Sequence, residues 1–260
     1  MINRQATIVP VHPVERLRYV ARAGDTSTVP LVREAAFALA DFAYDPMELL
    51  TACKRLVERR PACAPLVWVC ARILSGSDPA AEAYDCVSAL ERDRTCEELT
   101  NLIPGEASVL VVGRAEASGE AALWRPDIEL IPVDAADDED HPIGPLEQSV
   151  DLLVLEAEAV SDGEALLRAG AGPFAAAARQ TDVPVWLVAG LGRVLPEQMW
   201  IGATELAMRE HSGSGSYRSS GGYEVVPLDC VDTVVGPSGM HPVSELRYRR
   251  ECPIVPELFA

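Results

Sequence analysis

The sequence is short of basic residues. Its 260 residues include 22 lysines and arginines against 40 aspartates and glutamates, which gives a formal charge of −18 at pH 7. Nucleic acids and anionic membrane surfaces attract proteins with a basic face. We therefore expect no nucleic-acid partner and no membrane partner. The densest acidic run, Asp134 to Asp140, is interpreted as a solvated loop.

Long apolar runs and paired cysteine motifs are also missing. No uninterrupted apolar run of signal-peptide length occurs in residues 1–20, and no segment reaches the roughly 18 apolar residues that span a bilayer. The seven cysteines are odd in number, and no two have Cys-x-x-Cys spacing. This usage indicates a reducing, cytoplasmic setting without a disulfide framework or a zinc site.

The common cofactor and catalytic motifs are absent as well. The sequence has no Gly-x-Gly-x-x-Gly, Walker A, His-Glu-x-x-His or Gly-x-Ser-x-Gly motif, and the glycines of "VLVVGRAEASGE" and "LVAGLGRV" lack the required spacing. None of the four histidines is spaced as a metal pair, and each lies in or beside a predicted loop or terminus. We expect no cofactor and no metal, and we interpret the histidines as surface residues.

The first hundred residues have helical patterns. Apolar residues recur at helical spacing, and Asp45 followed by Pro46 is typical of a helix start. The residues from Arg60 to Gly76 are apolar on most sides and predict a buried helix. The expected helices cover residues 12–24, 25–43, 45–60, 60–76 and 78–103, the last as one helix or two.

After Pro104 the pattern changes to short apolar runs. Four of them predict strands, at residues 107–113, 128–134, 150–160 and 183–190, and helical stretches such as residues 172–180 separate some of these runs. Continuous apolar strands alternating with helices indicate a parallel sheet that is covered on both faces. The tail from Tyr223 predicts a further strand, a helix start and a strand. The small-residue segment 211–222 is interpreted as a surface loop, with a phosphate-binding loop as the alternative.

These patterns predict an α/β protein. A helical N-terminal bundle, residues 1–100, is followed by a doubly wound, mostly parallel, Rossmann-like domain, residues 101–260. Ligands of such sheets bind at the carboxyl ends of the strands.

Four segments, in order along the chain, carry a resemblance to a known family. The strand that ends in Glu156-Ala157-Glu158 is similar to one ending in Gly-Ala-Asp, and the segment 167–171 lies where that family has Asn-Lys-x-Gly-Thr. Arg60 and Pro61 begin a segment that resembles its Arg-Pro-x-x-x-x-Leu-x-Trp helix. The helix around Arg33 and the tail from Tyr223 also resemble family segments.

The family that these segments resemble contains the α, β and δ subunits of initiation factor 2B. It also contains methylthioribose-1-phosphate isomerase and ribose-1,5-bisphosphate isomerase. The resemblance implies that Glu158 stands where the isomerases have a catalytic aspartate. It also implies that the ligand-binding positions are Arg33, Arg60, Asp162, Arg168 and Gly170. Their catalytic cysteine, on the first strand of the sheet, has no counterpart in residues 107–120.

Two functions from different classes follow from the resemblance. The first is a non-catalytic or altered relative that binds a phosphorylated sugar or a nucleotide and forms a homodimer. The second is an aldose–ketose isomerase of sugar phosphates that uses Glu158 as its base. A protein that keeps the fold only for structure or assembly, without a ligand, is the third possibility.

Overall fold

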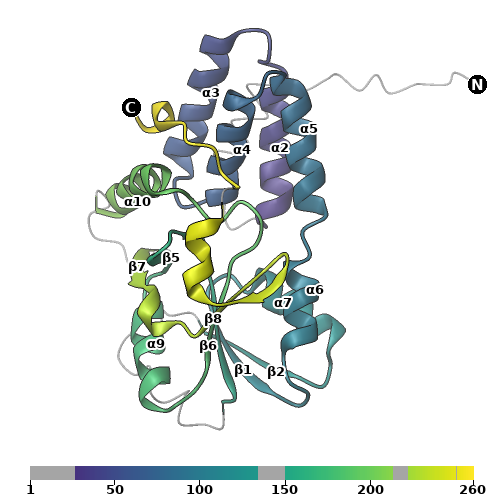
Figure 1. Cartoon of the computed structure of the whole chain (residues 1–260), viewed down its shortest axis with the longest axis vertical. Coiled ribbons are helices and arrows are strands. Elements are labelled where there is room, and N and C mark those ends of the chain that lie inside the picture. Colours follow the sequence, from purple (N-terminus) through teal and green to yellow (C-terminus); the bar gives the residue numbers. More distant parts are fainter. Residues whose placement is uncertain (1–26, 134–149, 213–221, 250) are drawn as a thin grey trace, which may run out of the picture.

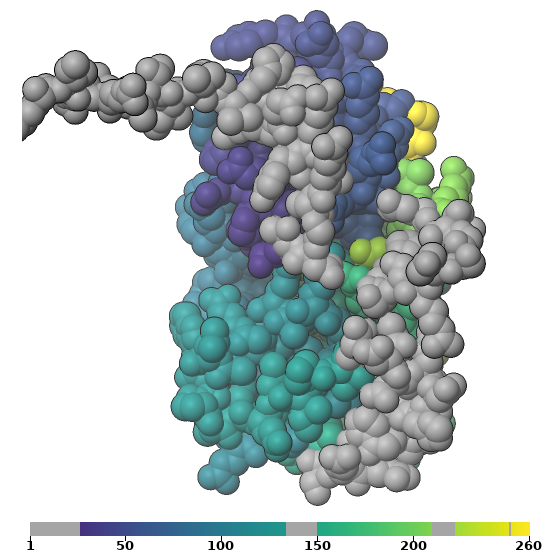
Figure 2. All heavy atoms as spheres, turned by 180° about the vertical axis from the view of Figure 1, so that it is seen from behind, coloured from purple at the N-terminus to yellow at the C-terminus, as the bar shows by residue number. Residues whose placement is uncertain are grey.

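The computed structural model describes residues 27–133, 150–212, 222–249 and 251–260. The expected helix at 12–24, the acidic loop at 134–140 and most of the loop at 211–222 lie outside these residues. Helices and strands occur in the predicted order, with a helical bundle at one end and the sheet at the other (Figure 1). Viewed from behind, the two parts form one continuous body (Figure 2).

Within the described residues, four helices build the bundle: α2 (Thr28–Ala40), α3 (Pro46–Arg59), α4 (Ala64–Ser75) and α5 (Pro79–Glu91). Asp45 caps α3 as predicted, because its carboxylate accepts hydrogen bonds from two backbone N–H groups of the first turn, each at 3.0 Å. The predicted buried helix is α4, whose Trp68 is fully buried. The start of α2 is capped from far away in sequence, because Glu116 accepts from the Thr28 N–H and hydroxyl.

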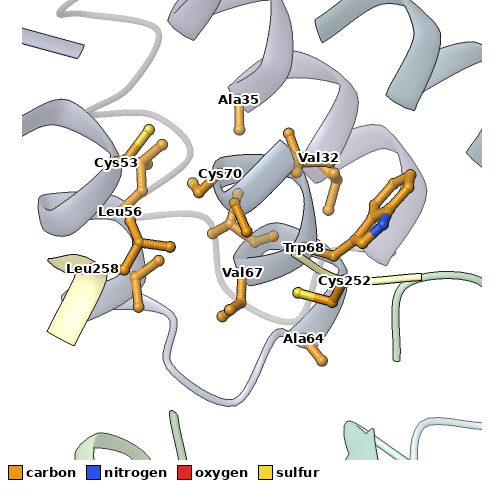
Figure 3. Packing of buried hydrophobic residues seen from close by; sticks show 14 of the residues in the cluster. Val32, Ala35, Cys53, Leu56, Ala64, Val67, Trp68, Cys70, Cys252 and Leu258 are labelled. Atoms are coloured by element: carbon orange, nitrogen blue, oxygen red, sulfur yellow. The ribbon is translucent and has the colours of Figure 1, made fainter. Parts of the chain in front are cut away.

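The C-terminal segment completes the core of the bundle. Cys252 and Leu258 pack among the buried residues of α3 and α4, which include Cys53 and Cys70 (Figure 3). The Trp68 indole N–H donates to the Glu251 carbonyl at 3.0 Å. Helix α10 (Glu197–Ser212) adds Met199 and Trp200 to the same cluster. The bundle is therefore built from both ends of the described chain.

The main sheet has the order β2-β1-β3-β6-β8-β9. All neighbours are parallel except β9, which pairs antiparallel with β8. The strands are β1 (Ser108–Val112), β2 (Glu129–Val133), β3 (Leu152–Glu156), β6 (Val185–Val188), β8 (Thr233–Gly236) and β9 (Gly239–His241). The predicted doubly wound, mostly parallel sheet is confirmed.

Alternate residues of each strand face opposite layers, which explains the continuous apolar runs. Leu110 and Leu153 pack on the side of α9 (Ala171–Gln180), whereas Val109 and Val154 pack on the side of α6 (Thr95–Leu102) and α7 (Glu116–Trp124). The residues predicted as helix 78–103 form α5 and α6, and α6 packs against the sheet part of the molecule.

A second sheet corrects the prediction for residues 150–171. The single strand expected at 150–160 is two strands, β3 and β4 (Ala159–Val160), and the loop expected before α9 contains β5 (Glu164–Arg168). Strands β4 and β5 join β7 (Tyr223–Pro227) in an antiparallel sheet of order β4-β5-β7. The short 3-10 helices η1 (Leu228–Cys230), η2 (Val243–Tyr248) and η3 (Pro256–Phe259) complete the tail.

Candidate functional site

The carboxyl edge of the main sheet contains its topological switch point between β1 and β3. Counted by their order in the chain, the five parallel strands have the spatial order 2-1-3-4-5, so the chain leaves β1 and β3 in opposite directions. Ligands of open α/β sheets bind outside the strand ends at such a point. The residues that follow β1 and β3 are therefore the candidate ligand-binding site.

Three arginines converge there on the carboxylate of Glu158. Nε of Arg114 donates to Oε1 at 2.9 Å, Nε of Arg168 lies 3.4 Å from Oε1, and Nη1 of Arg193 lies 3.9 Å from Oε2. The Glu158 side chain is only 6% exposed, and the three arginine side chains are 16 to 19% exposed. We call these four residues the Glu158 arginine cluster.

Each arginine arrives from a different loop or strand end. Arg114 follows β1 directly after Gly113, whose φ of +129° is in a region that L side chains rarely adopt. Arg168 ends β5, and its guanidinium lies 5.1 Å from the ring centre of Tyr223 on β7. Arg193 follows β6 and also donates to the Ala157 carbonyl at 2.6 Å. The cluster thus joins the two sheets at their contact.

A second carboxylate, that of Glu156, closes the start of α7. It accepts from the backbone N–H of Glu116 at 2.7 Å and of Ser118 at 2.8 Å, and from the Ser118 hydroxyl at 2.6 Å. Ala115, at the N-cap of α7, provides no side-chain cap. The N-terminus of a helix after the first strand is a common phosphate site. In this protein the Glu156 carboxylate occupies that position.

Two further ionisable groups interact with Glu158. Loss of hydration raises the pKa of the Cys63 thiol to about 11, and the negative charge of Glu158 adds to that rise. Cys63 is at the N-cap of α4, and the next N–H, that of Ala64, donates to the Glu158 carbonyl at 3.4 Å. Burial also raises the pKa of Tyr223, again with a contribution from Glu158. Both groups therefore keep their protons at neutral pH.

Anion binding and proton transfer make different demands on these side chains. A general base needs a lone pair free to reach a substrate proton. The Glu158 oxygens already face three guanidinium groups, so they are poorly placed to take a proton from a substrate. The same guanidinium groups are of the kind that binds phosphate oxygens well.

The residues predicted from the sequence lie in different places. Arg168 and Glu158 are together in the cluster. Arg33 is on α2, half exposed, and its Nη1 lies 3.6 Å from Oε1 of Glu91. Arg60 is the C-cap of α3, and its carbonyl accepts from the Cys63 N–H at 3.1 Å. Asp162 is exposed in the turn between β4 and β5.

Gly170 is the N-cap of α9. Its φ of +96° is in the left-handed region, where glycine carries no Cβ penalty.

Sequence reasoning missed Arg114 and Arg193. Both follow glycine-containing ends of predicted strands, in "VVGR" and "GLGR". An arginine directly after a parallel strand lies at the carboxyl edge of the sheet, and that signal could have identified both residues.

Among the described residues, no three or more His, Cys, Asp or Glu side chains are placed to hold a metal ion. Within the same ranges, no helix is both long and apolar enough to cross a membrane.

Comparison with known proteins identifies the fold. No protein-family model matches the chain, and no curated protein matches its sequence. Solved structures do match. Translation initiation factor eIF-2B from Pyrococcus horikoshii superposes with a TM-score of 0.65 and 14% identity, over 89% of this chain and 97% of that one.

Two other solved structures agree. A chain of the tetrameric eIF2B-beta2-delta2 complex from Chaetomium thermophilum has a TM-score of 0.61 and 16% identity, over 91% of this chain and 92% of that one. The 5-methylthioribose 1-phosphate isomerase from Pyrococcus horikoshii has a TM-score of 0.55 and 15% identity, over 90% and 86%. The chain therefore has the fold of the initiation factor 2B subunits and of methylthioribose-1-phosphate isomerase, as its resemblance to that family predicted.

Proposed function

We propose that this protein is a divergent initiation factor 2B-like protein that binds a phosphorylated sugar or a nucleotide without isomerising it. The ligand's phosphate binds at the Glu158 arginine cluster. The observation that carries this proposal is the convergence of Arg114, Arg168 and Arg193 on one buried carboxylate at the switch point.

The contacts of the two carboxylates support a site in which side chains, and not the N-terminus of α7, bind the phosphate. Glu156 already satisfies the N–H groups at the start of α7, so that helix end has no place for a ligand anion. Arginine side chains remain as the anion-binding groups at this edge, and they can bind phosphate oxygens bidentately.

The surroundings of Glu158 support a role without catalysis. Arg114 follows β1, the strand on which the related isomerases carry their cysteine, and it donates to Glu158. The thiol of Cys63, whose pKa burial and the charge of Glu158 raise to about 11, stays protonated at neutral pH. A protonated thiol cannot act as a base.

The alternative function is a sugar-phosphate aldose–ketose isomerase in which Glu158 is the base. Its support is that Glu158 lies at the carboxyl edge with two protonated groups, Cys63 and Tyr223, under its electrostatic influence. Proton NMR of ribose 5-phosphate in D₂O distinguishes the two functions. An isomerase forms the ketose and incorporates deuterium at C1 or C2, whereas we expect neither with the wild-type protein.

Homodimerisation in the cytoplasm is part of the proposal. The eIF2B beta–delta relative is described as a tetrameric complex. In this chain Leu123 and Trp124, at the end of α7, are 83% and 63% exposed, which suits a protein interface. The seven cysteines are free thiols, as expected in a reducing compartment. Sedimentation equilibrium of the wild type and of Trp124→Glu measures the association directly.

Thermal shift in phosphate-free buffer tests ligand binding. Inorganic phosphate, ribose 5-phosphate and adenosine monophosphate are each titrated, with ribose as the unphosphorylated control. A ligand that binds only the folded state raises Tm as its concentration rises. At 100 times Kd it adds about 2.7 kcal/mol to the free energy of unfolding. We expect a rise with at least one phosphorylated ligand and none with ribose.

The variants Arg168→Gln and Arg193→Gln should lose that rise. Arg209→Gln is the matched control, because the Arg209 side chain is 72% exposed on α10 and pairs with Glu205 one turn away. Equal shifts in all three variants, or no shift with any phosphorylated compound in the wild type, would contradict the proposed site.

A further inference from the structure

A serine, a histidine and a glutamate form a hydrogen-bonded relay in the hairpin after β8. Oγ of Ser238 lies 2.7 Å from Nε2 of His241, and Nδ1 of His241 lies 2.9 Å from Oε2 of Glu245. Ser238 is in the turn between β8 and β9, His241 ends β9, and Glu245 is in η2. None of the three belongs to the Glu158 arginine cluster.

The hydrogen-bond partners define the tautomer of the neutral histidine. A carboxylate only accepts hydrogen bonds, so Nδ1 of His241 carries the proton and donates it to Glu245. Nε2 is then an acceptor, and the Ser238 hydroxyl donates to it. This is the order of nucleophile, base and orienting carboxylate in serine hydrolases.

The backbone around the relay is fixed at several points. Gly239 has a φ of +95°, which closes the tight turn at Ser238. The Thr233 hydroxyl donates to the His241 carbonyl at 3.0 Å, and the Glu245 N–H donates to the Pro242 carbonyl at 3.0 Å to begin η2. Buried Leu246 anchors η2. These contacts hold the relay in position without a bound substrate.

The relay lies at the edge of the sheet where ligands bind. Strand β8 runs parallel to β6 and ends at Gly236, so the turn is at the carboxyl edge. Ser238 is exposed and His241 is partly exposed, so a small substrate can reach both.

A cation lies at the base of the same turn. The Arg249 guanidinium is 2.7 Å from where a Cβ on Gly236 would be, and its Nη1, which has no hydrogen bond, lies 3.8 Å from Oε1 of Glu251.

We propose that Ser238, His241 and Glu245 form a catalytic site, separate from the Glu158 arginine cluster, which hydrolyses small carboxylic esters. Ser238 Oγ forms a bond to the carbonyl carbon while Nε2 of His241 takes the hydroxyl proton. The ester C–O bond then breaks, and the proton passes to the leaving alcohol. Water attacks the acyl-serine, His241 takes a proton from the water and returns it to Ser238 Oγ, and the carboxylic acid leaves.

Hydrolysis of p-nitrophenyl acetate by the full chain tests this site. We compare the wild type with Ser238→Ala, His241→Gln and Glu245→Gln, and we use Ser244→Ala as the control, because Ser244 is an exposed serine on the same short helix. Loss of nucleophile or base should lower the rate by about 100-fold or more. Glu245→Gln should cause a smaller loss, and Ser244→Ala none. Circular dichroism and Tm confirm that each variant is folded.

A fluorophosphonate probe provides an independent readout. It should form an adduct on Ser238 in the wild type and in Ser244→Ala, located by mass spectrometry, and this adduct should be lost in His241→Gln. A wild-type hydrolysis rate equal to that of Ser238→Ala overturns the proposal, and so does a probe that leaves Ser238 unmodified.

Discussion

At the scale of single residues, two glutamates that are separated by one residue have different partners. Glu156 accepts hydrogen bonds from backbone N–H groups and a serine, whereas Glu158 faces three arginines. The chain turns between them, from the main sheet into the second sheet. The first carboxylate therefore stabilises a helix start and the second gathers cationic side chains into a site.

The residues that surround Glu158 could be predicted only in part. Arg168 is close in sequence and lies in a segment that resembles a known motif. Arg114 and Arg193 come from separate loops, and no local pattern says which loops meet at one carboxylate. The strand order decides that, and it depends on pairing between distant segments.

The buried thiols predict how stability depends on pH. Burial raises the pKa of Cys86 and of Cys252 to about 12, from 9.0. Below pH 9 these thiols are protonated in both the folded and the unfolded chain, so they do not change the free energy of unfolding with pH. Between pH 9 and about 12 the unfolded chain ionises first. The free energy of unfolding should then fall by about 1.4 kcal/mol per pH unit for each thiol.

Guanidinium unfolding under reducing conditions at pH 8, 9 and 10 measures this fall. The double variant Cys86→Ala/Cys252→Ala should lose less stability over that range than the wild type. Equal losses in the two proteins would show that these thiols do not keep their protons in the folded state.

At the scale of elements, β5 shows why part of the fold could not be predicted. Its residues, "EALLR", favour helix as strongly as strand. They form a strand because they pair with β7, more than fifty residues later. By contrast, β1, β3 and β6 are apolar on both faces, and the same pattern that predicts them also buries them between two layers.

Helix α7 depends on a cap from another element. Replacement of Glu156 by glutamine keeps the size of the side chain but removes the charge that several N–H groups share. A hydrogen bond to a charged group contributes about 1.5 to 3 kcal/mol. We expect Glu156→Gln to lower the free energy of unfolding by about that amount, measured by guanidinium titration with circular dichroism.

Glu129→Gln is the control for that variant. Glu129 is exposed on the edge strand β2 and should change stability by no more than about 0.5 kcal/mol. If Glu156→Gln were as stable as this control, Glu156 would not be the cap of α7.

At the scale of the whole molecule, the formal charge of −18 predicts a strong response to salt. Acidic residues repel one another across the surface, and this repulsion destabilises the compact state. Ions screen it, because the Debye length falls from about 10 Å at 0.1 M to about 3 Å at 1 M. We expect Tm to rise with potassium chloride over this range.

Charge reversal checks that cause. Glu58, Glu129 and Glu257 are exposed, and changing all three to lysine reduces the net negative charge without touching the core. The rise of Tm with salt should be smaller in this variant. A salt response that is independent of the charge would point to ion binding at specific sites instead.

In the proposed site, the arginines around Glu158 bind a ligand's phosphate in competition with Glu158 itself. Isothermal titration of ribose 5-phosphate into the wild type and into Glu158→Gln measures this competition. Glutamine removes a negative charge that would repel the phosphate. We predict that the variant binds about tenfold more tightly, or about 1.4 kcal/mol. Equal or weaker binding by Glu158→Gln would rule out this competition, because the ligand would then need the carboxylate or bind elsewhere.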